Sequence, residues 1–546
     1  MKKILFLLVI MLTVSCQEEP QPTADLIIEN ATIYSVDDAF SKATAIAVKD
    51  GKIIFMGSQE ELAKQNLIAS KTVDASGKFM YPGLIDAHCH FYRLGQQVQR
   101  VDLVETKSYQ EVLDKIQEFQ KANNKAFIIG RGWDQNDWEI KEYPTNKELN
   151  ELFPDTPVAI TRIDGHAMIV NETALKMAGI DTNTSFSGGD IEQKEGKLTG
   201  ILVDNPMKLV RDIFPVASVE EDIKALMDAQ DINFSYGITT VDDAGLMRST
   251  IELIDSLQQA KVLKMKVYAM ISNTPENLDY YLNKGIVKTD RLNVRSVKFY
   301  ADGALGSRGA AMKESYSDRQ DHFGALLSSV EDIEGIAKRI AATDYQMNTH
   351  AIGDSANYVV LKTYKDLLSG QKNRRWRVEH AQIVDPADFD LFDEENILPS
   401  VQPTHATSDM YWAEDRVGEE RIKGAYAYKK LLQQSKMLAL GTDYPVEQVN
   451  PFLTFYAAVS RKDTSGYPDN GFLADQALSR EEALRGMTIW AAYSNFEEKE
   501  KGSLEIGKAA DFILLDQDLM TVEVEKIPQM KVRATYSNGE LVYAAK

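Results

Sequence analysis

The chain has 546 residues, of which 44% are hydrophobic and 26% are charged, as in ordinary globular proteins. This composition excludes collagen, coiled-coil and wholly disordered chains. The formal net charge of −21 argues against binding to a phosphate backbone, so no nucleic-acid partner is expected. The two cysteines, Cys16 and Cys89, are too few for a disulfide framework.

The first sixteen residues have the plan of an export signal. Two lysines precede an apolar run over residues 4–12, and small residues follow it. This run is too short to span a bilayer as a stable helix. We therefore expect residues 1–16 to be a signal peptide and the mature protein to be exported.

The end of this segment, Val14-Ser15-Cys16, resembles a bacterial lipoprotein processing site. Thr13 departs from the pattern because leucine is usual there, and simple cleavage near Ser15 is the alternative. We expect Cys16 to be the lipidated residue and residues 17–23 to be a tether. Contact with a membrane of the bacterial cell envelope would then be made only through this anchor.

Hairpin signals occur near both ends of the chain. Asp50-Gly51 lies between two apolar runs, and Asn538-Gly539 lies between two others. Both dipeptides favour two-residue hairpin turns. The two ends, residues 24–82 and 500–546, are thus predicted to form one small β-sandwich domain.

The middle of the chain, residues 83–499, alternates buried-looking strands with amphipathic helices, which indicates βαβ units. The predicted strands are Leu84–His90, Ile238–Asp242, Lys264–Met270, Val294–Tyr300, Gln346–His350, Trp376–His380, Leu398–Pro403 and Met437–Asp443. Predicted helices between them include Ser218–Phe234, Val330–Thr343 and Ala356–Leu368. Eight strands favour an α/β fold of the (β/α)8 TIM-barrel type, with an open doubly wound sheet as the alternative. The long gap after the first strand predicts an insertion at about 95–215 that shapes the substrate site.

The clearest chemical signal is His88-Cys89-His90, at the end of the first barrel strand. Residues i and i+2 of a strand face the same side, so the two imidazoles project together and Cys89 points away. Imidazoles at the carboxyl end of a barrel strand can hold a divalent metal. For this motif alone, two satisfied polar residues at a strand end are the alternative.

Later strands end in further ligand types, namely His350, His380 and Asp443. Histidine and carboxylate ligands suit zinc, and also manganese, iron or nickel. Lys298 lies inside the fourth strand, where burying an amine without a partner is costly. It is either the source of a carbamate that bridges two metals or a lysine that reaches past the barrel rim.

This set resembles the metal ligands of the amidohydrolase superfamily, in the same strand order: His88, His90, Lys298, His350, His380 and Asp443. Other segments are similar to its amidohydrolase 3 subgroup, which includes N-substituted formamide deformylases: Gly132-Trp133-Asp134, Arg162-Ile163-Asp164-Gly165-His166, Asp302-Gly303-Ala304-Leu305-Gly306-Ser307-Arg308, His350-Ala351-Ile352-Gly353-Asp354, Glu379-His380-Ala381-Gln382, Thr442-Asp443-Tyr444-Pro445-Val446 and Gly507-Lys508-Ala509-Ala510-Asp511. The resemblance covers about residues 24–546. Leu198, Asp204 and Gly309 depart from its usual residues, which weakens any transfer of a relative's substrate.

The resemblance implies hydrolysis of a non-peptide carbon–nitrogen bond, in an N-substituted amide or formamide, by metal-bound hydroxide at one or two zinc ions. Asp443 would be the general acid and base. Lys298 would be carboxylated in a two-metal site. The alternatives are hydrolysis of a lactone, carbamate or cyclic amide by the same centre, and a non-catalytic surface binding lipoprotein.

His166 and His405 are further catalytic candidates, because either could hydrogen-bond an oxyanion; a loop histidine that caps backbone groups is the alternative. Trp133 is a candidate wall for an aryl or alkyl substituent, with simple packing as the alternative. Asp302 and Arg308 complete the expected substrate-binding residues. The expected partner is a small-molecule substrate, and a homodimer is one of the oligomeric states left open.

Overall fold

The computed structural model describes residues 23–163, 165–185, 189–393 and 395–546. The expected signal peptide with Cys16, and the tether as far as residue 22, lie outside the described residues. Thr23, the last residue of the expected tether, already begins strand β1 (Thr23–Glu29). Within the described ranges no helix combines the length and the apolar composition that crossing a bilayer requires.

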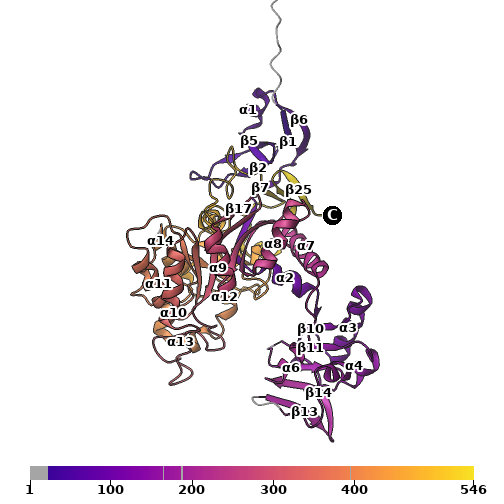
Figure 1. The fold of residues 1–546 in the computed structure, drawn as a ribbon. Helices are drawn as coiled ribbons and strands as arrows, with labels where there is room; N and C mark the ends of the chain where they lie inside the picture. Colours follow the sequence, from indigo (N-terminus) through magenta and orange to yellow (C-terminus); the bar gives the residue numbers. More distant parts are fainter. Residues whose placement is uncertain (1–22, 164, 186–188, 394) are drawn as a thin grey trace, which may run out of the picture.

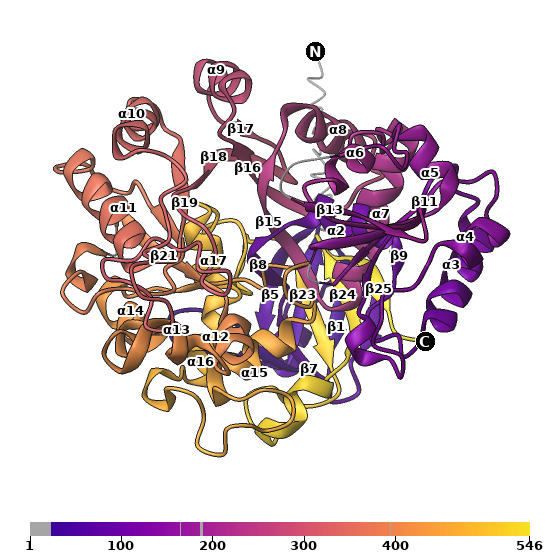
Figure 2. The same ribbon diagram turned by 90° about the horizontal axis from the view of Figure 1, so that it is seen from below.

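Eight parallel strands form the central barrel, which confirms the predicted fold class. In spatial order they are β8 (Leu84–Cys89), β15 (Ile238–Leu246), β16 (Lys266–Ser272), β18 (Leu292–Tyr300), β19 (Gln346–Ala351), β20 (Trp376–His380), β21 (Ile397–Val401) and β22 (Ala439–Leu440). Figure 2 shows the surrounding helices, which include α7 (Val219–Ser235), α8 (Arg248–Gln259), α9 (Pro275–Lys284), α10 (Val330–Ala341), α11 (Asp354–Leu367), α14 (Tyr428–Ser435) and α15 (Pro451–Ser460). The short β17 (Val287–Lys288) pairs antiparallel with β18.

Alternate side chains of β18 face either the hydrophobic core outside the barrel or the polar barrel interior. Val297 and Phe299 belong to the largest hydrophobic core, which joins strands to helices. Lys298 lies between them and faces the barrel interior, where its Nζ is 3.1 Å from Nε2 of His88. The period of two along a strand thus places one polar side chain inside the barrel while its neighbours pack outside.

The barrel is nearly closed where β22 approaches β8. The strand predicted over residues 437–443 is regular over only two residues, because the backbone turns through a positive φ of 62° at Asp443. The amide of Asp443 donates a hydrogen bond to the carbonyl of His88 at 2.8 Å. A Cβ at Gly441 would lie 2.5 Å from the amide nitrogen of His88, so only glycine permits this approach.

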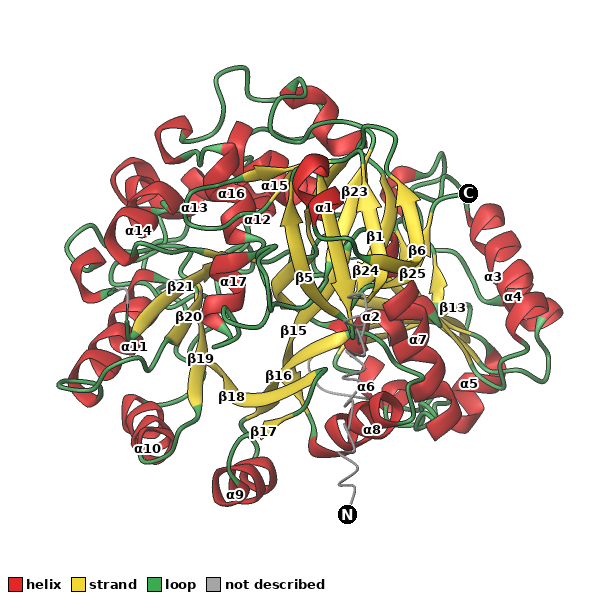
Figure 3. Ribbon diagram, turned by 90° about the horizontal axis from the view of Figure 1, so that it is seen from above, coloured by secondary structure: helices red, strands yellow, loops and turns green. Residues whose placement is uncertain are grey.

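Strands from both chain ends share one sheet above the barrel, as predicted. Its order is β25 (Glu540–Ala544), β24 (Val532–Ser537), β23 (Phe512–Leu515), β7 (Phe79–Pro82), β2 (Thr32–Tyr34) and β3 (Lys42–Ala43). The second sheet holds β1, β4 (Ala45–Lys49), β5 (Lys52–Gly57) and β6 (Ile68–Asp74), next to helix α1 (Gln59–Lys64) (Figure 3). Ile28 and Ile46 of one sheet pack with Phe512 and Leu514 of the other in one core.

The two predicted hairpin turns are both present in this sandwich. Asp50 and Gly51 connect β4 to β5 with φ values of 50° and 75°. Asn538 and Gly539 connect β24 to β25 with φ values of 50° and 71°. Two consecutive positive φ values define the turn that matches the twist of a hairpin.

The insertion after β8 forms a body of its own, at the lower right of Figure 1. Its elements are β9 (Val101–Asp102), α3 (Tyr109–Asn123), β10 (Ile128–Trp133), α4 (Lys147–Leu152), β11 (Val158–Arg162), β12 (Ala167–Val170), α5 (Glu172–Met177), β13 (Gly189–Lys194), β14 (Lys197–Asp204) and α6 (Met207–Arg211). The two hydrophobic cores described for it contain only residues of the insertion. Helix α2 (Phe91–Val98), which precedes it, packs into the barrel core through Leu94.

Candidate metal centre

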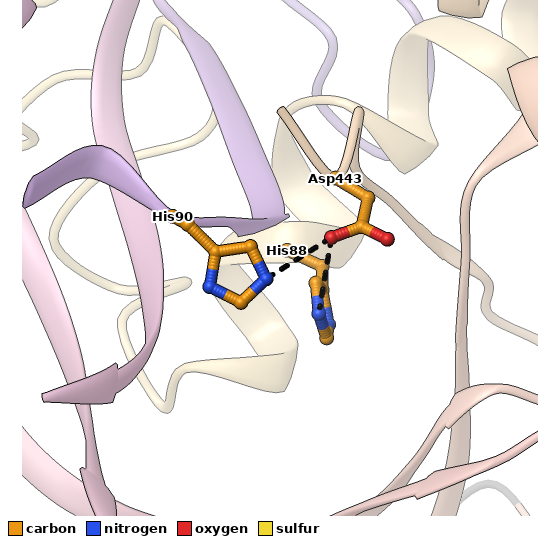
Figure 4. A group of neighbouring side chains, drawn as sticks. All are labelled: His88, His90 and Asp443. Atoms are coloured by element: carbon orange, nitrogen blue, oxygen red, sulfur yellow. Dashed lines mark ion pairs between the residues drawn. The ribbon is translucent and has the colours of Figure 1, made fainter. Parts of the chain in front are cut away.

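The carboxyl ends of five barrel strands bring the predicted ligands together. Two groups of side chains each bring their possible ligand atoms within 4.8 Å of one another: His88, His90 and Asp443, and His380, His405 and Asp443. His405 was not among the predicted ligands, and the predicted Lys298 and His350 belong to neither group. Asp443 belongs to both groups and therefore lies at the centre of the cluster. Figure 4 shows the first group, in which both imidazoles are directed at the Asp443 carboxylate.

The first group surrounds one carboxylate oxygen. Oδ1 of Asp443 lies 3.2 Å from Nε2 of His90 and 3.8 Å from Nε2 of His88. Lys298 approaches the same His88 nitrogen at 3.1 Å. Burial lowers the pKa of the Lys298 amine to about 8, which brings its neutral form within reach near physiological pH.

Three of the histidines are held from behind by hydrogen-bond acceptors. The Nδ1 atoms of His88, His90 and His380 lie 2.6 Å from Oε2 of Glu379, 3.0 Å from the carbonyl of Ala244 and 2.7 Å from Oε1 of Gln402, respectively. Because each partner is an acceptor, we infer that Nδ1 carries the proton and that Nε2 keeps its lone pair. An imidazole oriented in this way is prepared to bind a metal through Nε2.

Two buried atoms of the pocket have no hydrogen-bond partner among the described residues: Nε2 of His350 and Oδ1 of Asp443. Leaving such atoms unsatisfied is costly, and both are ordinary metal ligands. Burial and the nearby Lys298 charge lower the pKa of His350 to about 3, so this imidazole is neutral at pH 7, the form that binds metal. The donor set of neutral imidazoles and a carboxylate therefore fits a divalent metal such as zinc.

The remaining oxygen of the central carboxylate faces His405, on helix α12 (Pro403–Asp409). Nε2 of His405 lies 3.1 Å from Oδ2 of Asp443, and its Nδ1 lies 3.2 Å from Oε1 of Glu447. Although burial lowers the pKa of His405, the two carboxylates raise it to about 10. Burial raises the pKa of Asp443, but the hydrogen bond from His405 and the neighbouring imidazoles bring it well below its ordinary value. The pair is thus an imidazolium beside a carboxylate.

The Amidohydrolase family model matches residues 71–543 of the chain. The chain belongs to the amidohydrolase family. It is 32% identical over 539 residues to Protein LONG AFTER FAR-RED 3 of Arabidopsis thaliana, covering 95% of this chain and 92% of that protein. It is 26% identical over 548 residues to the N-substituted formamide deformylase of Arthrobacter pascens, covering 95% and 98%.

A solved structure supports the same assignment. An uncharacterized metal-dependent hydrolase from Pyrococcus horikoshii OT3 matches with a TM-score of 0.77 and 30% sequence identity, over 91% of this chain and 99% of that chain. The resemblance inferred from the motifs is thereby confirmed. This amidohydrolase is a metal-dependent hydrolase whose His and Asp cluster suits a divalent metal.

Two residues expected to contact substrate lie on the insertion of this amidohydrolase, not at its ligand cluster. Trp133 is fully buried in an insertion core, and its Nε1 donates to the carbonyl of Ile160 at 3.0 Å. It has no exposed surface that could form a substrate wall, so the packing interpretation describes it. His166 has a side chain that is 74% exposed, and its Nδ1 lies 2.7 Å from Oδ1 of Asp204.

The other two expected substrate contacts have partners within the protein. Asp302 is buried, and its carboxylate accepts hydrogen bonds from the backbone amides of Ala311, Ile352 and Gly353. Its Oδ1 also lies 3.6 Å from Nε2 of His350, so Asp302 orders the backbone that directly follows β19 next to this ligand. Arg308 forms a two-pronged ion pair with the carboxylate of Asp318, at 3.0 and 2.7 Å.

Sequence reasoning missed the residues that support the amidohydrolase ligands. Glu379 precedes His380 on β20, and strand alternation predicts that one of the two faces outward. Both face the barrel interior, because His380 has a positive φ of 72° that breaks the alternation. A glutamate inside a buried strand next to a ligand histidine was the available signal. Tyr300, whose ring lies 5.6 Å from that of His350, was also missed.

Proposed function

We propose that this amidohydrolase hydrolyses a non-peptide carbon–nitrogen bond, in an N-substituted amide or formamide. The observation that carries the proposal is the buried convergence of His88, His90 and His380 on the ionised carboxylate of Asp443. The relative from Arthrobacter pascens, named as an N-substituted formamide deformylase, supports the choice of bond.

The roles follow from the positions of the side chains. His88, His90, His350 and His380 would hold the metal together with Asp443. A divalent cation there supplies Lewis acidity, which polarises a carbonyl oxygen and acidifies a water molecule. Asp443 is ionised, so it can accept a proton from water and return it to the leaving nitrogen. His405 engages a carboxylate with each ring nitrogen, so we assign it to positioning Asp443 in place of the expected oxyanion contact.

Lys298 is proposed to be carboxylated. Its neutral amine would attack carbon dioxide, forming an N–C bond as one C=O π bond opens and releasing a proton, and the carbamate oxygens would serve as metal ligands. The lowered pKa and the 3.1 Å approach to His88 support this role. An unmodified Lys298 would leave a one-metal centre.

Zinc is proposed as the metal, because the ligand types are those of zinc sites. A lipid anchor on Cys16 is proposed from the sequence of the first sixteen residues. The enzyme would then be anchored in the bacterial cell envelope and act there on small molecules.

The test uses protein without the leader, reconstituted with zinc, and compares an N-alkylformamide with the formate ester of the same alkyl group. We expect a higher kcat/KM for the formamide and one or two zinc ions per chain by elemental mass spectrometry. Asp443→Asn should lower kcat by roughly 100- to 10,000-fold, whereas Asp318→Asn, a carboxylate paired with Arg308, should not. Preference for the ester would favour the lactone alternative, and binding without turnover would favour the binding protein.

The same measurement on Lys298→Ala tests the carbamate. Two zinc ions in the parent and one or none in the variant would support a two-metal centre. One zinc ion in both proteins would assign Lys298 to a structural role and leave hydrolysis at a single metal.

A further inference from the structure

The barrel interior behind His88 contains buried polar side chains that the proposed reaction does not use. Arg377 on β20 is fully buried. Its Nη1 donates to Oδ2 of Asp242 at 2.9 Å and to the backbone carbonyl of Ala87 at 3.0 Å. The same nitrogen lies 3.8 Å from Oε1 of Glu379. Arg377 therefore contacts the backbone of Ala87, next to His88. It also faces the carboxylate of Glu379, which holds the His88 ring.

The chain of contacts continues to the C-terminal part of the molecule. Asn495 follows helix α17 (Ile489–Ser494) and is fully buried. Its Nδ2 donates to Oδ1 of Asp242 at 2.6 Å. Nη2 of Arg377 donates to its Oδ1. Asn495 and Asp242 together thus fix the plane of the Arg377 guanidinium.

Glu379 depends on this guanidinium for its position. Its Oε2 is used by His88, and its Oε1 has no hydrogen-bond partner among the described residues. The guanidinium of Arg377, 3.8 Å away, is an ion-pair partner that restrains Oε1. A guanidinium fixed by two partners holds its direction, whereas one free to rotate would release the carboxylate.

We propose that Arg377, Asp242 and Asn495 are positioning residues that aim the lone pair of His88 Nε2 into the ligand pocket. They act through two contacts, one to Glu379 and one to the backbone before His88. This inference rests on the proposed metal centre. It places a determinant of metal affinity at the far end of the barrel interior, in a residue that contacts no ligand.

Asn495→Leu is the decisive variant, because leucine fills a similar volume and removes both hydrogen bonds. We expect zinc affinity, measured by competition with a chromophoric chelator, to fall about 10- to 100-fold. In the metal-free protein, labelled with ¹⁵N-histidine, the downfield proton signal of His88 Nδ1–H should broaden or disappear. That signal is assigned by its loss in His88→Gln. Arg377→Lys, which keeps the charge but not the planar fork, should give an intermediate affinity.

Asn293→Leu is the matched control. Nδ2 of Asn293 donates to the backbone carbonyl of Asn495 at 3.1 Å and to Glu497 at 3.3 Å. It is buried beside Asn495, but these two hydrogen bonds reach neither Arg377 nor Asp242. We expect this variant to lose stability while it keeps the parent's zinc affinity and its His88 signal.

The inference is overturned if Asn495→Leu keeps zinc affinity within twofold and an unchanged His88 signal while losing as much stability as Asn293→Leu. The network would then be a structural ion pair only. A parent protein that binds no zinc would overturn the proposed function instead. In that case the imidazole signal of the metal-free protein still decides whether the network orients His88.

Discussion

The two oxygens of the Asp443 carboxylate face different histidines. Oδ2 lies 3.1 Å from Nε2 of His405, and Oδ1 lies 3.2 Å from Nε2 of His90. The positive φ of 62° at Asp443 turns the chain out of β22 and sends the side chain into the cluster. One oxygen is thus fixed by an imidazolium, and the other has no hydrogen-bond partner among the described residues.

Glu447→Gln should move the pH dependence of the reaction. The carboxylates of Asp443 and Glu447 raise the pKa of His405 to about 10, so loss of one carboxylate lowers that pKa. If the cationic form of His405 positions Asp443, activity is lost as the pH rises through the pKa of His405. We expect the basic limb of kcat/KM to shift to lower pH by about one unit. Ser408→Ala removes the 2.6 Å contact to Glu447 and a 3.4 Å hydrogen bond to the carbonyl of His405 but keeps both carboxylates, so it should leave the limb in place.

Glu379→Gln should weaken metal binding. The amide can still contact His88 Nδ1 but no longer carries the charge that increases the basicity of the ring. We expect zinc affinity to fall about 10- to 100-fold in a chelator competition. Glu498→Gln, which breaks an ion pair with Arg375 away from the ligands, should bind zinc like the parent. If Glu379→Gln binds zinc as tightly as Glu498→Gln and the parent, Glu379 does not support metal binding.

Gly441→Ala should destabilise the seam of the barrel. Its Cβ would lie 2.5 Å from the amide nitrogen and 2.8 Å from the carbonyl oxygen of His88. We expect a loss of about 1–3 kcal/mol or more in the free energy of unfolding, measured by urea denaturation. Gly335→Ala in α10 meets nothing within 4 Å and should be neutral or stabilising. A loss in both variants would point to a general effect of removing glycine.

Protonation of Glu497 should account for part of the loss of folding stability in acid. Burial raises the pKa of this carboxyl, but Lys501 and Lys288 lower it to about 2 from an ordinary 4.5. A lowered folded-state pKa contributes stability that is complete above pH 4.5 and is lost as pH falls toward 2. At about 1.4 kcal/mol per pH unit this interval corresponds to about 3 kcal/mol.

The measurement is urea denaturation of the parent and of Glu497→Gln at pH 7, 4 and 3. We expect the variant to be less stable at pH 7, with a difference that narrows as the pH falls. A difference that stays constant over this range would show that the carboxylate does not titrate with folding.

Trp133→Ala separates packing from substrate contact. Removal of a fully buried indole should cost about 3–5 kcal/mol, seen as earlier unfolding of the insertion by proteolysis or hydrogen exchange. Zinc content should stay that of the parent, because the insertion core contains no ligand. A stable variant with an altered KM would return Trp133 to a substrate-binding role.

The local patterns of the sequence were sufficient for the fold and for most of the ligand set. The period of two places His88 and His90 on one side of β8, and the Asp50-Gly51 and Asn538-Gly539 turns follow from residues that accept positive φ. These features depend on near neighbours in the chain. They can therefore be predicted without knowing what packs against them.

The support of the site depended on the tertiary structure. His380 faces the interior beside Glu379 only because its own backbone departs from strand geometry. His405 meets Asp443 because β21 and β22, the strands that precede them, pair side by side. The burial of Trp133 likewise depends on how the insertion packs. The sequence by itself determined the elements and the ligand types, since these reflect local backbone preference and side-chain chemistry. The tertiary structure decided which side chains orient the ligands, because such contacts join residues that are from about twenty to almost three hundred positions apart.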